Sequence, residues 1–211
     1  FVSNNFIDSN KAEIIPTGVD LSKFDYRKFK VSKDSDVFNF LYVGRLHIDK
    51  GFFEYISASK KMSTINDNIF FHIVGDFLSK KDKSIHVENL NFKNSVYHGY
   101  KNDIRDILIN ADCVVMPSKR EGMSNILLES GSFAKLSITT NVPGCKEIIS
   151  NNYNGFIIQN VDTQLLFQAM KNVYFLDKNK KAKMEKNALR NIENNFNYES
   201  VKQFYIKLLS H

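Results

Sequence analysis

Two glutamates, Glu121 and Glu129, are separated by seven residues in a segment that contains a glycine and small polar residues. We expect a helix to begin near Met123 or Ser124, with Glu121 in the preceding loop and Glu129 about two turns in, on the floor of a cleft. The free N–H groups at such a helix start form an anion site. A carboxylate can accept two hydrogen bonds from neighbouring hydroxyls. The segment therefore predicts a site for a phosphate that is attached to a polyol.

Two cations lie in an earlier loop, where they could supply the opposite charge. Arg45 and Lys50 follow Gly44 and open a predicted helix. Arginine offers phosphate oxygens a planar fork of donors, and lysine offers a mobile point charge. Taken singly, both cations could be surface charges beside a turn. Likewise, Glu121 could be a first-turn acid favoured by the helix dipole, and Glu129 a solvated helix residue.

Apolar runs precede both loops and predict the elements that position them. The runs over 38–43 and 69–74 are apolar on both faces, as buried parallel strands are. Further strands are predicted over 95–98, 112–116, 136–140 and 155–158. Segments whose apolar residues recur at helical spacing lie between most of these strands. This alternation predicts an α/β fold, a Rossmann-like parallel sheet with helices on both faces. Ligands of such sheets bind beyond the carboxyl ends of the strands, where the charged loops lie.

The rest of the chain adds helices and one polar excursion. We predict a helix over 124–133, apolar helical stripes over 165–173 and 198–208, and a surface excursion over 78–94. The 211 residues suit a single domain, 1–211. Because the first residue is not a methionine, we expect the chain to be part of a longer protein.

Composition limits the function classes. The net charge of +6 reflects lysine runs such as 178–186, which predict a solvated helix face, although attraction to phosphates, anionic lipid or nucleic acid is the alternative. No basic and aromatic residues interleave as nucleic-acid binding requires. The only cysteines, Cys113 and Cys145, fit neither a disulfide framework nor a zinc site and agree with a reducing cytosol. No stretch is apolar enough to span a bilayer.

The ordered set of these motifs resembles the C-terminal half of family 4 glycosyltransferases, which have the two-domain GT-B fold. Four further landmarks carry the resemblance: Ile15-Pro16-Thr17-Gly18-Val19-Asp20, Val74-Gly75-Asp76, Asn141-Val142-Pro143-Gly144-Cys145-Lys146-Glu147 and Asn154-Gly155-Phe156. Thr17 stands where the family usually has asparagine. After Glu129, the chain has Ser130-Gly131-Ser132 where the family usually reads Ala-Met-Ala.

The resemblance implies binding of a nucleotide diphosphate sugar, with a uridine diphosphate sugar favoured, and retention of anomeric configuration without metal or cofactor. Arg45 and Lys50 then hold the diphosphate, and Glu121 lies near the donor sugar, so these three form the catalytic set. The positions that correspond to donor-binding residues are Glu129 at the ribose, Gly122, Met123, Ser124, Asn125, Gly44, and Gly99 and Tyr100 at the base. Tyr100 could equally pack in the core.

The implied protein is a hexosyltransferase of bacterial surface polysaccharide synthesis, such as capsule or O-antigen assembly. Its acceptor, a glycan or lipid-linked glycan, would bind an N-terminal domain outside this chain, so the chain alone should transfer little sugar. We expect a cytoplasmic protein, with contact to the inner face of the membrane left open, and no nucleic-acid partner. The alternatives are a nucleotide-sugar epimerase of similar architecture, a non-catalytic nucleotide-binding module and a glycoside hydrolase, which also pairs carboxylates.

Overall fold

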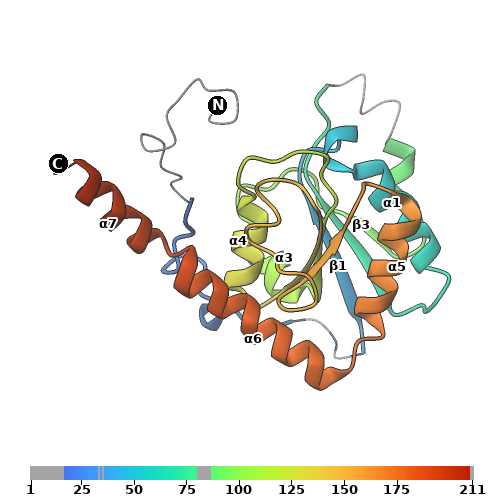
Figure 1. The fold of residues 1–211 in the computed structure, drawn as a ribbon. Helices are drawn as coiled ribbons and strands as arrows, with labels where there is room; N and C mark the ends of the chain where they lie inside the picture. Colours follow the sequence, from blue (N-terminus) through green and yellow to red (C-terminus); the bar gives the residue numbers. More distant parts are fainter. Residues whose placement is uncertain (1–16, 33, 35, 80–86, 210–211) are drawn as a thin grey trace.

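One parallel sheet organises the molecule. The computed structural model describes residues 17–209 except 33, 35 and 80–86, so Ile15 and Pro16 lie outside the described residues. Six strands run in the order β3-β2-β1-β4-β5-β6, and every neighbouring pair is parallel (Figure 1). Their bounds are β1 Phe38–Val43, β2 Ile69–Val74, β3 Ser95–Tyr97, β4 Cys113–Met116, β5 Leu136–Thr140 and β6 Phe156–Ile158. All six predicted strands are confirmed, with boundaries that differ by one residue at 98, 112 and 155.

Helices cover both faces of the sheet, as the alternating pattern predicted. The helices are α1 Phe52–Met62, α3 Arg105–Asn110, α4 Asn125–Ser132, α5 Thr163–Tyr174, α6 Lys178–Asn195 and α7 Tyr198–Leu209, with short 3-10 turns η3 Tyr26–Lys28, η4 Ile48–Lys50 and η5 Val87–Leu90. Helices α1 and α5 pack together on one face, and α4 packs on α6 on the other (Figure 1). Within β1, Phe40 and Tyr42 face α1 while Leu41 faces α3 and α4, which is why the strand is apolar on both sides.

The strand order reverses between β1 and β4, and this reversal places the site. From β1 the chain proceeds outward through β2 to β3, and from β4 it proceeds the other way to β6. The loops after β1 and β4 therefore leave toward opposite faces and open a crevice between them. Arg45 and Lys50 lie in the first loop, and Glu121 lies in the second.

Helix α4 begins later than the sequence predicted. Ser124 is extended, with φ −80° and ψ 104°, so the first helical residue is Asn125. Glu129 is consequently just over one turn into the helix instead of two. Farther along, Gly131 contacts α6 closely, because a Cβ there would lie 2.5 Å from Cγ1 of Ile192. The absence of a side chain at Gly131 thus permits close packing of α4 on α6.

The C-terminal helices separate into a packed part and a projecting part. Helix α6 carries the lysine run on a largely exposed face, as predicted, except that Lys181 binds Asp112 at 2.9 Å. Helix α7 projects from the body (Figure 1), and Tyr198 and Tyr205 are 49% and 46% exposed. Of its predicted apolar stripe, Tyr198 and Tyr205 are therefore uncovered and Val201 is buried, while the side chain of Leu208 lies outside the described residues. In the described part of the chain, every helix is too short or too polar to cross a membrane.

Gly51 joins the turn η4 to helix α1 under a double constraint. Its φ of 63° lies in the left-handed region, where side chains are disfavoured. A Cβ at this position would also lie 2.1 Å from the carbonyl oxygen of Pro117. The loop after β1 and the loop after β4 therefore meet backbone to backbone at this glycine.

Gly51→Ala is expected to lower the free energy of unfolding by about 2–4 kcal/mol, because it combines a strained φ with a steric overlap. Gly122→Ala is the matched control, since a Cβ at Gly122 would meet no atom beyond its chain neighbours within 4 Å and its φ lies outside the left-handed region. Its effect should stay within about 0.5 kcal/mol. Urea unfolding of both variants checks this, and equal losses would contradict the account of Gly51.

Candidate functional site

A cavity opens at the carboxyl ends of β1 and β4, where the strand order reverses. Its volume is about 220 Å³. Its lining includes Gly44, Lys50, Ser118, Glu121, Met123, Ser124 and Asn125. Six of these seven residues were predicted from the sequence to belong to one site, and the structure brings them together from loops about seventy residues apart.

An ion pair crosses this cavity. Nζ of Lys50 lies 2.6 Å from Oε1 of Glu121, and the two side chains are only 20% and 15% exposed. The hydroxyl of Ser118 donates to the same oxygen at 2.8 Å. Among the described residues, no hydrogen bond involves Oε2 of Glu121, so one carboxylate oxygen is anchored while the other is available to a ligand.

Strand β5 holds the loop that carries Glu121. The hydroxyl of Thr140 donates to the carbonyl of Ser118, and that of Thr139 donates to the carbonyl of Met116 at 3.0 Å. Both threonines are buried. Two hydroxyls of β5 therefore hold the last residue of β4 and the loop that follows it, which limits how far Glu121 can move.

The N-terminus of α4 faces the same cavity without a side-chain cap. The hydroxyl of Ser124 turns inward to Met116 and makes no capping hydrogen bond. The backbone N–H of Ser124 donates to the carbonyl of Gly144 at 3.1 Å. Gly144 has φ 81°, and a Cβ there would overlap the carbonyl oxygen of Gly122, so only glycine fits this junction. The first N–H groups of α4 remain available for an anion.

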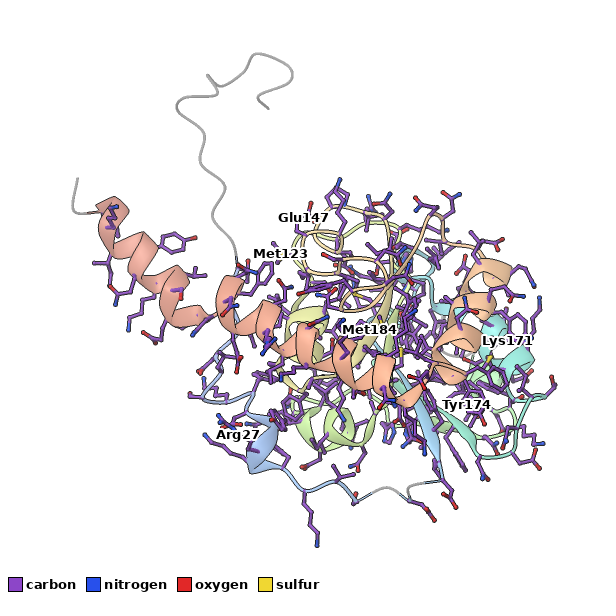
Figure 2. The ribbon with its side chains drawn as sticks, turned by 60° about the horizontal axis from the view of Figure 1, so that its bottom comes forward. Arg27, Met123, Glu147, Lys171, Tyr174 and Met184 are labelled. Atoms are coloured by element: carbon purple, nitrogen blue, oxygen red, sulfur yellow. The ribbon has the colours of Figure 1, made fainter. Side chains whose placement is uncertain are left out.

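Figure 2 shows the side chains around this junction. Met123 and Glu147 are labelled there, and Gly144, on the loop that carries Glu147, lies against the backbone of Gly122 and Met123. The carboxylate of Glu147 accepts a hydrogen bond from the N–H of Gly144 at 2.7 Å. The loop after β5 thus supports the start of α4 through backbone contacts.

Glu129 lines a second cavity, of about 260 Å³, instead of the floor of the first. This cavity lies between α4 and the segment 17–20, and Phe24 also lines it. Asn125 lines both cavities and is the residue where they adjoin. The seven-residue gap therefore places the two glutamates in neighbouring compartments, on either side of the helix start.

Burial of Glu129 changes its ionisation. Desolvation, with a further contribution from Asp103, raises the pKa of Glu129 from 4.5 to about 7. Ionisation of Glu129 is therefore costly in this buried position, and hydroxyl donors from a ligand would lower that cost.

Gly99 and Tyr100 were predicted to line the base pocket, and neither lines the first or the second cavity. Gly44, Gly75 and Gly99 follow one another across the ends of β1, β2 and β3, because the N–H of Gly75 donates to Gly99 at 2.9 Å and a Cβ on Gly75 would overlap Gly44. Gly99 is thus two strands from the first cavity. Tyr100 is 69% exposed, so core packing is the wrong alternative for it.

Arg45 and Gly122 are exposed, and neither lines the first or the second cavity. The carbonyl of Arg45 is nevertheless fixed, since the buried hydroxyl of Tyr42 donates to it at 2.8 Å. Burial, and then the charge of Glu121, raise the pKa of Tyr42 well above its usual value, so its hydroxyl remains a donor. Tyr42 and Ser118 were not predicted as site residues; a hydroxyl near the carboxyl end of a largely apolar strand was the available signal for Tyr42.

Other polar groups lie apart from this site. A cavity of about 270 Å³ beneath α3 is lined by Asn39, His72 and His98, but it contains none of the predicted residues. The described residues hold no group of three or more histidines, cysteines, aspartates or glutamates that could bind a metal ion. Metal-free chemistry stays a prediction.

Glu129→Gln is expected to alter the pH dependence of stability. Because the folded-state pKa of Glu129 is above the unfolded value, the protonated carboxyl contributes to the free energy of unfolding. That contribution is complete below about pH 4.5 and is lost as the pH rises through about 7. The free energy of unfolding of the variant should therefore exceed that of the wild type by about 1–3 kcal/mol at pH 8 and should be nearly equal to it at pH 4. Urea unfolding at the two pH values tests this, and a difference independent of pH would contradict it.

Comparison with known proteins assigns the family. Residues 23–191 match the family described as glycosyl transferases group 1. The UDP-Gal:alpha-D-GlcNAc-diphosphoundecaprenol alpha-1,3-galactosyltransferase of Escherichia coli is 30% identical over 97% of this chain and 56% of its own length. The capsular polysaccharide biosynthesis glycosyltransferase CapM of Staphylococcus aureus is 24% identical over 95% of this chain and 55% of its own length.

A solved structure agrees with the fold. Anabaena Alr3699/HepE in complex with UDP-glucose superposes with a TM-score of 0.82 at 19% identity, covering 99% of this chain and 60% of that chain. The chain spans little more than half the length of these two relatives. Its fold is the Rossmann-like C-terminal half of a GT-B glycosyltransferase, as predicted, and by its sequence match the chain belongs to the glycosyl transferases group 1 family.

Proposed function

We propose that the chain is the donor-binding half of a retaining hexosyltransferase of family 4 type that makes bacterial surface polysaccharide. The observation that carries this proposal is the pair of adjoining cavities, with Glu121 and Lys50 in one, Glu129 in the other, and the uncapped start of α4 at their junction. A nucleotide diphosphate sugar has the same order of groups: polyol, diphosphate, polyol.

The donor would bind across Asn125. In this arrangement the ribose hydroxyls donate to Glu129, and the diphosphate lies over the start of α4 within reach of Lys50. Arg45, on the exposed side of the loop, contacts the diphosphate from outside. The hexose occupies the first cavity, where the available oxygen of Glu121 accepts from its hydroxyls.

The nucleobase would lie toward Gly99 and the exposed ring of Tyr100. A uridine diphosphate sugar is the favoured donor. Two observations support it: the complex of HepE contains UDP-glucose, and the E. coli relative is named for UDP-Gal.

The reaction breaks the bond between the anomeric carbon and the diphosphate, so negative charge grows on the departing diphosphate. Lys50 and the N–H groups of α4 would stabilise that charge electrostatically. Glu121 would orient the hexose and favour the oxocarbenium-like state. Retention of configuration and independence of metal and cofactor are carried over from the family 4 resemblance.

The acceptor side lies outside this chain. The E. coli relative is named for a diphosphoundecaprenol-linked sugar, and a glycan or lipid-linked glycan is the acceptor we propose. An N-terminal domain would bind it, so the chain alone would bind donor yet transfer little sugar. We also propose a cytoplasmic location, with contact to the inner membrane face left open.

Two alternatives would leave different compounds in a reaction mixture. A nucleotide-sugar epimerase of this architecture would convert its substrate without an acceptor, and a non-catalytic module would leave it unchanged. A product assay with the full-length protein separates them. A glycoside hydrolase has no use for the cation and helix start beside the carboxylates.

Calorimetric titration of UDP and UDP-glucose tests the division of the site. Lys50→Ala should weaken both ligands about tenfold, because both contain the diphosphate. Glu121→Gln should weaken UDP-glucose more than UDP, because only the former reaches the first cavity. Lys61→Ala, at the far end of α1, is the control and should bind both normally. Equal affinity of wild type and Lys50→Ala for UDP would sink the assignment.

Tyr42→Phe should weaken UDP binding about threefold to tenfold, because the carbonyl of Arg45 loses the donor that fixes the loop. Tyr55→Phe is the matched control, since its buried hydroxyl donates to the carbonyls of Phe40 and His72 away from the site. Both variants should lose about 1 kcal/mol of stability, and only Tyr42→Phe should lose affinity. Similar affinities in the two variants would count against the role of Tyr42.

A further inference from the structure

Asp49, which the proposed mechanism does not use, connects the two loops of the site a second time. Its carboxylate contacts Nη2 of Arg120 at 2.7 Å, and its carbonyl accepts from the N–H of Lys119 at 2.8 Å. Its own N–H donates to Nδ1 of His47 at 3.2 Å. Asp49 is therefore fixed within its own loop and bonded to the facing loop through both side chain and backbone.

In both loops, this connection lies one residue before the functional pair. Asp49 precedes Lys50, and Arg120 precedes Glu121, so an outer pair of acid and base lies beside an inner pair of base and acid. A slip of one residue in either direction would place Lys50 opposite Arg120 or Asp49 opposite Glu121. Both contacts bring like charges together, so the alternating charges favour a single register.

The outer pair also differs from the inner pair in its relation to the cavity. Neither Asp49 nor Arg120 lines the first cavity, whereas Lys50 and Glu121 both do. A diphosphate would draw Lys50 away from Glu121 and weaken the inner pair. The outer pair, which the ligand does not touch, would then keep the two loops together.

We propose that Asp49 and Arg120 are positioning residues that hold the loops after β1 and β4 in register, so that Lys50 and Glu121 face one donor. This inference rests on the proposed function. The Arg120 side chain is 82% exposed, and an ion pair of that kind contributes little to global stability. Its effect should therefore appear in donor binding and hardly in unfolding.

Charge reversal separates register from simple attraction. A long-range charge effect would tighten UDP-glucose binding in Asp49→Arg and weaken it in Arg120→Asp, because the ligand is anionic. Loss of register weakens binding in both. We expect each single variant to bind about tenfold more weakly by calorimetry, and Asp49→Arg/Arg120→Asp to return within about threefold of wild type.

Two controls complete the experiment. The midpoint of thermal unfolding should move by no more than about 2 °C in the single variants. The exposed pair of Lys93 and Asp67, away from the site, should tolerate the same reversal with unchanged affinity. Tighter binding by Asp49→Arg, unchanged binding by either single variant, or no recovery in the double variant would overturn the inference. If wild type itself bound no nucleotide diphosphate sugar, the proposed function would fall, and this inference with it.

Discussion

The ion pair between Lys50 and Glu121 is the interaction on which the rest of the site depends. Its charges come from loops after β1 and β4, which the reversal of strand order separates and aims at one crevice. Desolvating two charges costs free energy unless each is well paired and hydrogen-bonded. Ser118 provides Glu121 with a second donor, and Tyr42 fixes the backbone that leads to Lys50. The packing around the loops thus holds Lys50 and Glu121 in positions from which either charge could pair with a ligand instead.

The same packing explains why the helix start is open. The hydroxyl of Ser124 turns inward, so α4 is uncapped, and glycine at 144 lets the next loop support the helix from below. Gly131 lets α6 approach α4 on the far side. Close packing therefore holds the helix firmly while its first N–H groups and Asn125 remain exposed to both cavities. A ligand with a diphosphate between two polyols matches this arrangement, in which an anion site lies between two carboxylates.

Much of this could be predicted from local sequence, and the exceptions have a common cause. Strands buried on both faces are recognisable because alternate residues such as Phe40 and Leu41 are both apolar. The cavity of Glu129 was not predictable, because its other wall is the segment 17–20. That segment is held in place by a distant residue: the N–H of Val19 donates to the carbonyl of Phe196 at 2.8 Å. Likewise, only the assembled sheet shows that Gly99 is two strands from the first cavity. Local patterns identified the residues, and long-range packing decided which compartment each one faces.

The central claim is that Glu129 binds the ribose of a donor whose diphosphate lies at the start of α4. Calorimetric titration of uridine diphosphate and its 2′,3′-dideoxy form into wild type and Glu129→Gln at pH 8 tests it most directly. Removing the hydroxyls should weaken binding to wild type about tenfold and should cost little further in Glu129→Gln, because both changes delete one interaction. Additive losses, or full-strength binding of the dideoxy form to wild type, would contradict the claim.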